Sequence, residues 1–315
     1  MNPPAAQAAP RWWPRPNLRV LVPFVLLSLI WGSTWLVIRD QLGTVPPGWS
    51  VTWRFVLATV AMFALAWWRK NPLRLDARGQ LMAFLIGAPQ FALNFQLVYR
   101  SEQHLTSGVV AIVFTLLFAY NAVLGRVFLG RKLSSRFVVG SAIAIVGIAL
   151  LLLNETQRVG IVPSGGGGDV WLGTAMVLAA ILCASSANVL QSTRAVERLP
   201  IFTLLAWALL WGALVNAVLA WAISGPPTFE PRLGYALGVA YLALVGSVAA
   251  FPLYFRLLRD IGAAQGAYVN VVVPIVAMTL STLFEGYRWS ALAVAGVVVA
   301  LAGMAVALSA RKPST

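Results

Sequence analysis

The sequence predicts an all-α polytopic membrane protein whose ten transmembrane helices form two five-helix halves of opposite orientation. Three features predict this class: the composition, the spacing of the apolar runs, and the distribution of basic residues. Hydrophobic residues fill 60% of the 315 positions and charged residues only 10%, whereas soluble domains carry roughly 25% charged residues. A soluble core of this size could not bury so much apolar surface, but a bilayer accepts it.

The apolar residues are grouped in runs, and a helix that crosses the hydrocarbon core needs about 20 mostly apolar residues. Ten runs meet this requirement, at residues 18–38, 49–68, 80–99, 106–125, 137–153, 171–191, 202–223, 234–254, 266–284 and 289–309. Several runs are closely spaced, so run length alone leaves nine or eleven spans as alternatives.

The basic residues favour ten spans. If ten runs alternate in direction, 17 of the 23 Lys and Arg residues fall on one side, 5 fall on the other, and Arg54 lies within the second run. The Lys- and Arg-rich side of a membrane protein is the cytoplasmic side, so we expect both termini in the cytoplasm. Because these residues lie in short loops, the net charge of +14 does not indicate nucleic-acid binding.

The chain divides into five segments on this prediction. They are a cytoplasmic tail at 1–17, a first repeat at 18–153, a glycine-rich extracytoplasmic linker at 154–170, a second repeat at 171–310 and a cytoplasmic tail at 311–315. The first tail has no cleavable signal pattern, so we expect the first run to be retained as a helix. The excess of Arg over Lys, with many Ala and Gly residues, is typical of a GC-rich bacterial genome and favours a bacterial inner membrane.

An internal repeat relates the two halves. At a shift of 156 residues, four positions match: Gly130, Ser134, Gly140 and Gly147 fall on Gly286, Ser290, Gly296 and Gly303. Gly and Ser are common in membrane helices, so coincidence is the alternative, but matches in helices of the same order favour duplication. Five helices in each half give the halves opposite topology. Inverted repeats are common in transporters, where the exchange of the two halves' conformations moves access across the membrane.

Four short motifs suggest a family. They are Trp31-Gly32-Ser33-Thr34-Trp35, Trp53-Arg54-Phe55, Leu129-Gly130-Arg131-Lys132-Leu133-Ser134 and Phe284-Glu285-Gly286-Tyr287-Arg288-Trp289-Ser290. Over residues 18–310 the chain resembles EamA-type members of the drug/metabolite transporter superfamily. The resemblance implies ten helices, two EamA repeats around a central cavity, and export of small metabolites such as amino acids.

The chain departs from the family pattern at two positions. Phe118 stands where the fourth helix of the family often has proline, although the counterpart Pro274 is present. Arg131 stands where a glutamate usually follows glycine, and Glu285 lies one position earlier in the second half. A coupling role for that glutamate is therefore in doubt in the first half and open for Glu285.

Polar side chains within apolar runs are costly and mark candidate substrate pathways. Arg54 holds a substrate carboxylate, extends to the outer surface or pairs with an acidic residue in a loop. Gln90 and Asn94 are four residues apart and share a helix face, where they either bind a zwitterion or link helices. Ser185 and Asn188 share a face of the sixth helix, with the same two alternatives.

Further residues are candidates for lining a cavity or for bending helices. The cavity candidates are Trp31, Ser33, Trp35, Tyr99, Trp207, Trp211, Tyr241, Tyr268 and Asn270. Trp and Tyr also gather at lipid interfaces, which is the alternative for the aromatic members. The hinge candidates are Pro89, Pro252 and Pro274, because each removes a backbone donor within a helix; simple tolerance of proline is the alternative.

The sequence lacks the residues that proton relays, ATP use and metal binding require. All nine carboxylates lie in predicted loops or at helix ends, so no mid-membrane acid is available for a proton relay. No phosphate-binding loop indicates ATP use, and no His, Cys or acidic cluster would hold a metal. We therefore expect no catalytic residue, cofactor or metal, with a small-molecule substrate and the lipid bilayer as partners. A monomer suffices, and the oligomeric state stays open.

The sequence therefore predicts a secondary carrier that exports amino acids or related small metabolites by alternating access. A non-transporting scaffold or partner subunit is one alternative, which nothing in the sequence excludes. A membrane-embedded lipid enzyme is the other, and it would need paired carboxylates or a histidine cluster that the sequence lacks.

Overall fold

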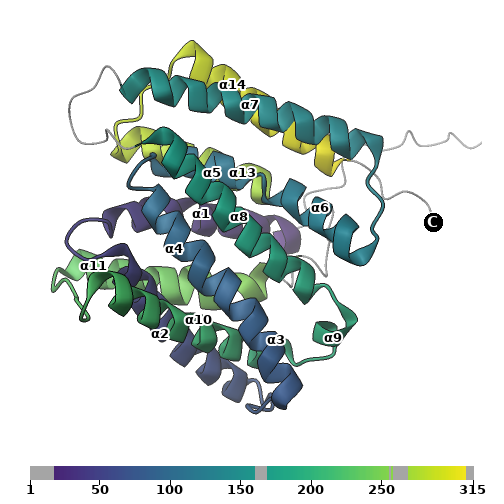
Figure 1. The fold of residues 1–315 in the computed structure, drawn as a ribbon, viewed down its shortest axis with the longest axis vertical. Helices are drawn as coiled ribbons and strands as arrows, with labels where there is room; N and C mark the ends of the chain where they lie inside the picture. The colour runs from purple at the N-terminus through teal and green to yellow at the C-terminus, as the bar shows by residue number, and fades with distance from the viewer. Residues whose placement is uncertain (1–17, 160–168, 255–256, 258–268, 310–315) are drawn as a thin grey trace, which may run out of the picture.

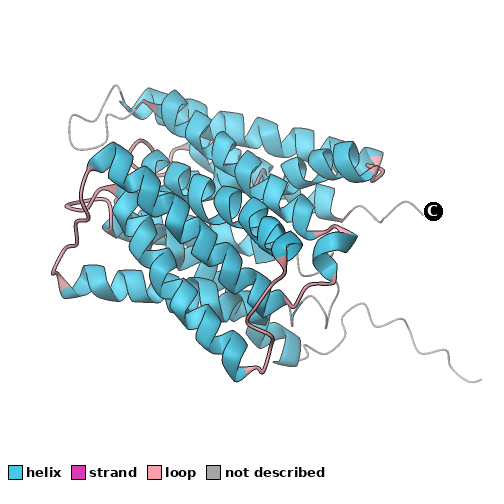
Figure 2. Ribbon diagram, turned by 60° about the horizontal axis from the view of Figure 1, so that its bottom comes forward, coloured by secondary structure: helices cyan, strands magenta, loops and turns pink. Residues whose placement is uncertain are grey.

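The computed structural model describes residues 18–159, 169–254, 257 and 269–309, which form a bundle of helices (Figure 1). Figure 2 shows helices and loops in these ranges and no strand. Nine of the described helices are long and apolar enough to cross a membrane, and α13 (Val269–Phe284) is a shorter apolar helix of 16 residues. The predicted all-α, polytopic class is confirmed. The tails at 1–17 and 311–315, residues 160–168 of the linker, and Tyr268 lie outside the described residues.

The helices follow the predicted runs. The first half holds α1 (Leu18–Asp40), α2 (Pro47–Trp68), α3 (Ala77–Gly87), η1 (Ala88–Leu93), α4 (Asn94–Ser101), α5 (Ser107–Phe114), α6 (Leu117–Leu129) and α7 (Ser135–Val159). The second half holds α8 (Val170–Gln191), α9 (Arg194–Glu197), α10 (Ile201–Ser224), α11 (Leu233–Ala240), η2 (Tyr241–Ala249), α13 and α14 (Ala291–Leu308). Three spans consist of several elements: Ala77–Ser101 joins α3, η1 and α4, Ser107–Leu129 joins α5 and α6, and Leu233–Tyr254 includes α11 and η2.

The helix α7 is longer than predicted, because it continues to Val159 through residues expected in the linker. Its last turns find partners across the bundle. The side-chain oxygen of Asn154 accepts a hydrogen bond from the Ser290 hydroxyl. The Glu155 carboxylate accepts one from the Tyr287 hydroxyl at 3.0 Å. These contacts satisfy polar groups that the sequence pattern assigns to a solvated loop.

The helices α6 and α13 end in the same way, at positions that the internal repeat aligns. Gly130 and Gly286 have positive φ angles of 65° and 68°, the left-handed conformation in which glycine ends many helices. Ser134 and Ser290 then cap α7 and α14. Each serine hydroxyl accepts a hydrogen bond from the amide three residues further on, at 3.1 Å and 3.0 Å. The aligned residues therefore share conformation and role, which favours duplication over coincidence.

The helices α7 and α14 lie side by side along one edge of the bundle (Figure 1). Glycines let the two backbones touch. A Cβ added to Gly147 would lie 2.2 Å from the Ala300 nitrogen, and a Cβ added to Gly140 would lie 2.7 Å from the Gly303 carbonyl oxygen. An added Cβ on Gly296 would lie 2.9 Å from the Gly147 carbonyl oxygen. Small residues allow such close approach in membrane helix pairs. The aligned glycines thus pair crosswise, Gly140 with Gly303 and Gly147 with Gly296.

The remaining contacts interleave the halves. The helices α1, α2 and α4 of the first half pack against α13, α10 and α8 of the second, respectively. Glycines again permit close approach, since a Cβ on Gly87 of α3 would lie 2.2 Å from the Ala208 carbonyl oxygen of α10. The two halves therefore pack against each other through several helix pairs.

Two spans contain π-helical segments, η1 and η2, and these occur in the third and eighth predicted runs. Pro89 lies within η1, and Pro252 follows η2. Tryptophan and asparagine side chains from other helices donate to carbonyl oxygens of these segments: Trp31 to Gly246 at 3.3 Å and Asn216 to Phe91 at 2.8 Å. Irregular helix turns of this kind often occur at functional sites.

Candidate functional site

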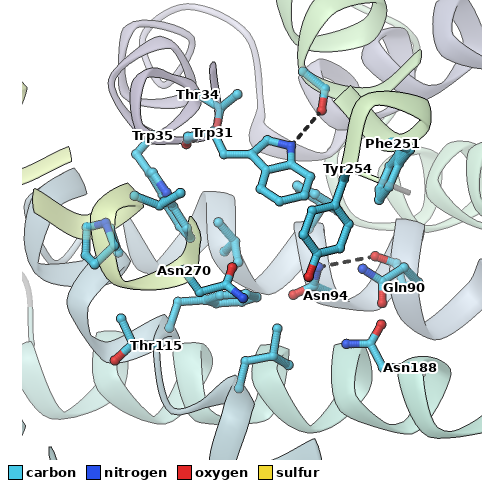
Figure 3. Close-up of a pocket in the computed structure, with 18 of the residues that line it drawn as sticks. Trp31, Thr34, Trp35, Gln90, Asn94, Thr115, Asn188, Phe251, Tyr254 and Asn270 are labelled. Carbon is cyan, nitrogen blue, oxygen red and sulfur yellow. Dashed lines mark hydrogen bonds between the residues drawn. The ribbon is translucent and has the colours of Figure 1, made fainter. Parts of the chain in front are cut away.

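A cavity of about 530 Å³ lies inside the bundle. Its walls come from α1, α2, η1, α4, α5 and α6 of the first half and from α8, α10, η2, α13 and α14 of the second. This volume falls within the usual range for small-molecule sites, roughly 300–1,000 Å³. Figure 3 shows the amides of Gln90, Asn94 and Asn188 gathered in one part of the cavity.

Aromatic rings form much of the apolar wall. The ring centroid of Trp31 lies 5.1 Å from that of Tyr254 and 6.2 Å from that of Phe251. On the other side, Trp35 packs edge-on against Phe114 at 5.4 Å. Paired rings fix one another's orientation, so this wall offers a rigid apolar surface to a bound molecule.

Amide side chains supply the polar part of the cavity. Asn188 of α8 donates to the Asn121 side chain of α6 at 3.4 Å, so one amide pair joins the two halves. Asn94 donates to the Gln90 backbone carbonyl at 3.2 Å. The side-chain oxygens of Gln90 and Asn94 are buried and accept no hydrogen bond. Both residues line the cavity, and a buried hydrogen bond that is left unmade is costly.

Arg54 is the buried cation of the cavity, with 3% of its surface exposed. One guanidinium nitrogen donates to the Ser247 hydroxyl at 3.4 Å, while Nε and Nη1 have no acceptor among the residues that the structure describes. The Phe95 ring lies 4.5 Å from the guanidinium carbon, and the Tyr99 phenol lies close by. Among the described residues, no carboxylate forms an ion pair with Arg54. A buried charge without a counter-ion is costly, so this site favours an incoming anion.

Among the described residues, the cavity lining extends further toward one end of the bundle than toward the other. Gln191 and Leu308, the last residues of α8 and α14, line it. At the other end the lining stops at Ile38 and Val98, before α1 and α4 finish. Beyond them lie buried residues, among them Glu102 with 0% exposure. We call this second end the closed end.

The family model for the EamA-like transporter family matches residues 19–153 and again residues 171–309. The chain belongs to this family. Protein PagO of Salmonella typhimurium is 26% identical over 298 residues, covering 94% of each chain. The Uncharacterized inner membrane transporter YedA of Escherichia coli is 31% identical over 296 residues, covering 91% of each. A solved crystal structure shares the fold, with a TM-score of 0.64 at 18% identity over 92% of this chain and 96% of its own.

This EamA-like transporter brings together about half of the residues that the sequence singled out. The cavity is lined by the predicted candidates Trp31, Trp35, Arg54, Gln90, Asn94, Asn188, Asn270 and Pro274. They come from six different elements and from both halves. Arg54 is buried and does not extend to the outer surface, so the alternative of a surface-reaching side chain is wrong.

Other predicted candidates of this EamA-like transporter lie outside the cavity wall. The hydroxyls of Ser33 and Tyr241 bond to each other at 2.7 Å. Tyr99 is fully buried and donates to the Gln41 side chain at 3.1 Å. Ser185 is fully buried within the bundle.

Two tryptophans and two prolines are also placed elsewhere. Trp207 donates to the Leu73 carbonyl at 2.8 Å, and Trp211 donates to the Gln80 side chain at 3.0 Å. Pro89 and Pro252 do not line the cavity, although their neighbours Phe91 and Phe251 do.

Several lining residues could not be predicted from the sequence. Phe91, Phe95 and Phe114 lie in apolar runs, where a ring that lines a cavity cannot be distinguished from one that faces lipid. Asn121 carries a usable signal, because it is a polar residue within a span and lies three residues beyond Phe118, which also lines the cavity.

A matched pair of cysteine variants tests the cavity. Asn188 lines it, whereas Ser185, one helical turn away, is fully buried. In a Cys183→Ser background, we expect Asn188→Cys to react with a small water-soluble thiol reagent at least about tenfold faster than Ser185→Cys, because reaction requires solvent access. Labelling rates by mass spectrometry measure this. Equal rates would mean that water does not reach Asn188.

Proposed function

We propose that the chain is a secondary carrier of the bacterial inner membrane that exports small carboxylate-bearing metabolites, chiefly amino acids, by alternating access. The observation that carries this proposal is Arg54, a buried guanidinium that lines the cavity without a carboxylate partner. A substrate carboxylate would supply the missing counter-charge and accept from the free Nε and Nη1 donors.

The amide acceptors favour a zwitterion over a simple anion. The free oxygens of Gln90 and Asn94 would accept from an ammonium group. The rings of Trp31 and Phe95 would cover the rest of a small molecule. Carboxylate, ammonium and apolar parts together describe an amino acid or a close relative.

Ten spans in two inverted repeats are part of the proposal. The shorter helix α13 would be the ninth span, in line with the basic residues that place both termini in the cytoplasm. The aligned pairs Gly130 with Gly286 and Ser134 with Ser290 support the duplication, because each pair has the same conformation or capping role. On this orientation the cavity faces the cytoplasm and the closed end faces outward.

Alternating access would open the closed end while the cytoplasmic end closes. Pro274 lies inside α13 and lines the cavity, so a bend there would move the wall directly. Pro89 and Pro252 lie in or beside the π-helical segments η1 and η2, where altered turns provide further hinges. A scaffold without transport would not explain a cavity lined by an unpaired cation and free acceptors.

Counterflow in proteoliposomes tests the proposal. Liposomes that contain the purified protein would be preloaded with unlabelled amino acids, nucleosides or sugars. The labelled counterpart would then be added outside, with protein-free liposomes as the control. We expect amino acids or other small carboxylates to accumulate and neutral sugars to stay at the control level. Accumulation of neutral compounds alone, or of nothing from verifiably folded protein, would contradict the proposal.

A further inference from the structure

The closed end contains a carboxyl group that the transport cavity does not use. Glu102 follows α4, in a short loop where a carboxylate is ordinarily solvated, yet its exposure is 0%. Neither of its carboxyl oxygens has a hydrogen-bond partner in the described part of the chain. Arg39, at the end of α1, donates to the backbone carbonyl of Glu102 and not to its carboxylate. Among the described residues, no ion pair involves Glu102.

A second carboxyl group, that of Glu285, comes from the connection between α13 and α14. Its Oε2 accepts from the Ser281 hydroxyl at 2.7 Å and from the Ser107 amide at 3.1 Å, while its Oε1 is buried without a partner. The Ser107 hydroxyl is fully buried and has no partner either, nor has the neighbouring Thr106 hydroxyl. Each of these hydroxyls can accept a hydrogen bond as well as donate one. A proton on a carboxyl group supplies a donor.

The electrostatics agree with this geometry. Burial first, and then the nearby Glu285 carboxylate, raise the pKa of Glu102 well above its usual value, while Arg39 lowers it in part. A buried carboxylate without a counter-charge takes up a proton because the neutral form avoids the desolvation cost.

We propose that Glu102 is a proton-binding residue that carries a proton while this end of the transporter is closed and releases it when the end opens to water. The inference rests on the proposed alternating access. Because the closed state binds the proton more tightly than the open state, lower pH stabilises the closed state and higher pH destabilises it. The proton is thus a ligand that selects one conformation.

The surrounding charges set the pH range over which Glu102 binds its proton, and they connect the proton site to the cavity. The charged and titratable groups on the elements around this end are Arg39, Asp40, Tyr99, Arg100, His104, Glu155, Asp169, Arg232, Glu285, Tyr287 and Arg288. Asp40 pairs with Arg232 at 3.0 Å. Tyr99 is close enough to both Arg54 and Glu102 to interact with each charge. An anion bound at Arg54 therefore changes the potential near the proton site.

Infrared spectroscopy of the purified, folded protein tests the proton directly and needs no substrate. We expect the carbonyl stretch of a protonated carboxyl group at neutral pH, its loss in Glu102→Gln, and its retention in Glu155→Gln, a carboxyl group that has partners. In Glu285→Gln the band should remain and titrate at lower pH, because a neighbouring negative charge has been removed. Absence of the band from the parent protein would overturn the proposal.

Cysteine labelling tests the link to opening. In a Cys183→Ser background, Ser107→Cys reports the closed end, and Gln103→Cys, which is exposed in the same loop, corrects for the reagent's own pH dependence. We expect the corrected labelling of Ser107→Cys to rise several-fold with pH, and to stay slow at all pH values when Glu102→Gln is added. A pH-independent ratio in the parent would overturn the gate. Since neither readout involves transport, failure of counterflow alone would contradict the proposed function and leave the proton site standing.

Discussion

Replacing Arg54 with methionine should reduce transport of the carboxylate substrate by about 10- to 150-fold. Hydrogen bonds to a charged partner contribute about 1.5–3 kcal/mol, and each 1.4 kcal/mol is a tenfold change in affinity. Within the described part of the chain, Nε and Nη1 of Arg54 have no hydrogen-bond partner, so these donors are available to the substrate. Initial rates of counterflow in proteoliposomes, at matched protein content, measure the effect.

The stability of the same variant separates a binding role from a structural one. A buried charge without a partner destabilises the folded protein, so Arg54→Met should unfold at the same temperature as the parent or a higher one. Arg54→Lys keeps the charge and loses the planar guanidinium, and should retain part of the transport. Lost transport together with lost stability would assign Arg54 to the packing of the bundle instead.

Substituting alanine for Gly147 should give the largest loss of stability. The added Cβ would lie 2.2 Å from the Ala300 nitrogen, so α7 and α14 must move apart. Forced separation of well-packed elements costs about 1–3 kcal/mol. The aligned position Gly303 should behave alike, since its Cβ would lie 2.3 Å from the Ala144 nitrogen. Thermal unfolding in detergent measures both.

The chain supplies a matched control for the glycine variants. Gly43 lies in the loop after α1, and an added Cβ there would have no atom within 4 Å. We expect Gly43→Ala to unfold within a degree or so of the parent. If Gly147→Ala were as stable as Gly43→Ala, the close contact between α7 and α14 would be wrong.

The helices were predictable because a bilayer imposes a length and a polarity on every span. Run length and loop charge sufficed to place the nine helices that can cross the membrane within the described residues. They failed at the end of α7, where Asn154 and Glu155 are polar but find Ser290 and Tyr287 across the bundle. Tertiary partners of this kind leave no trace in local sequence.

The residues of the site could be predicted only where a polar residue lies within an apolar run. Arg54, Gln90 and Asn94 stand out because polar groups are rare at such positions. The aromatic wall was not predictable beyond Trp31 and Trp35, since rings suit lipid, packing and cavities equally. The position of Glu102 in a loop suggested solvation, but packing of loops from several helices buries it.

The central claim is that the cavity carries molecules by holding their carboxylate at Arg54. Counterflow with matched pairs, in which each transported acid is compared with its own carboxamide, tests it most directly, because the pair differs in charge and hardly in shape. We predict that the acid accumulates and that the carboxamide is transported at least about tenfold less, the effect of one charged hydrogen bond. Equal transport of both would contradict the claim and move the binding of substrate away from Arg54.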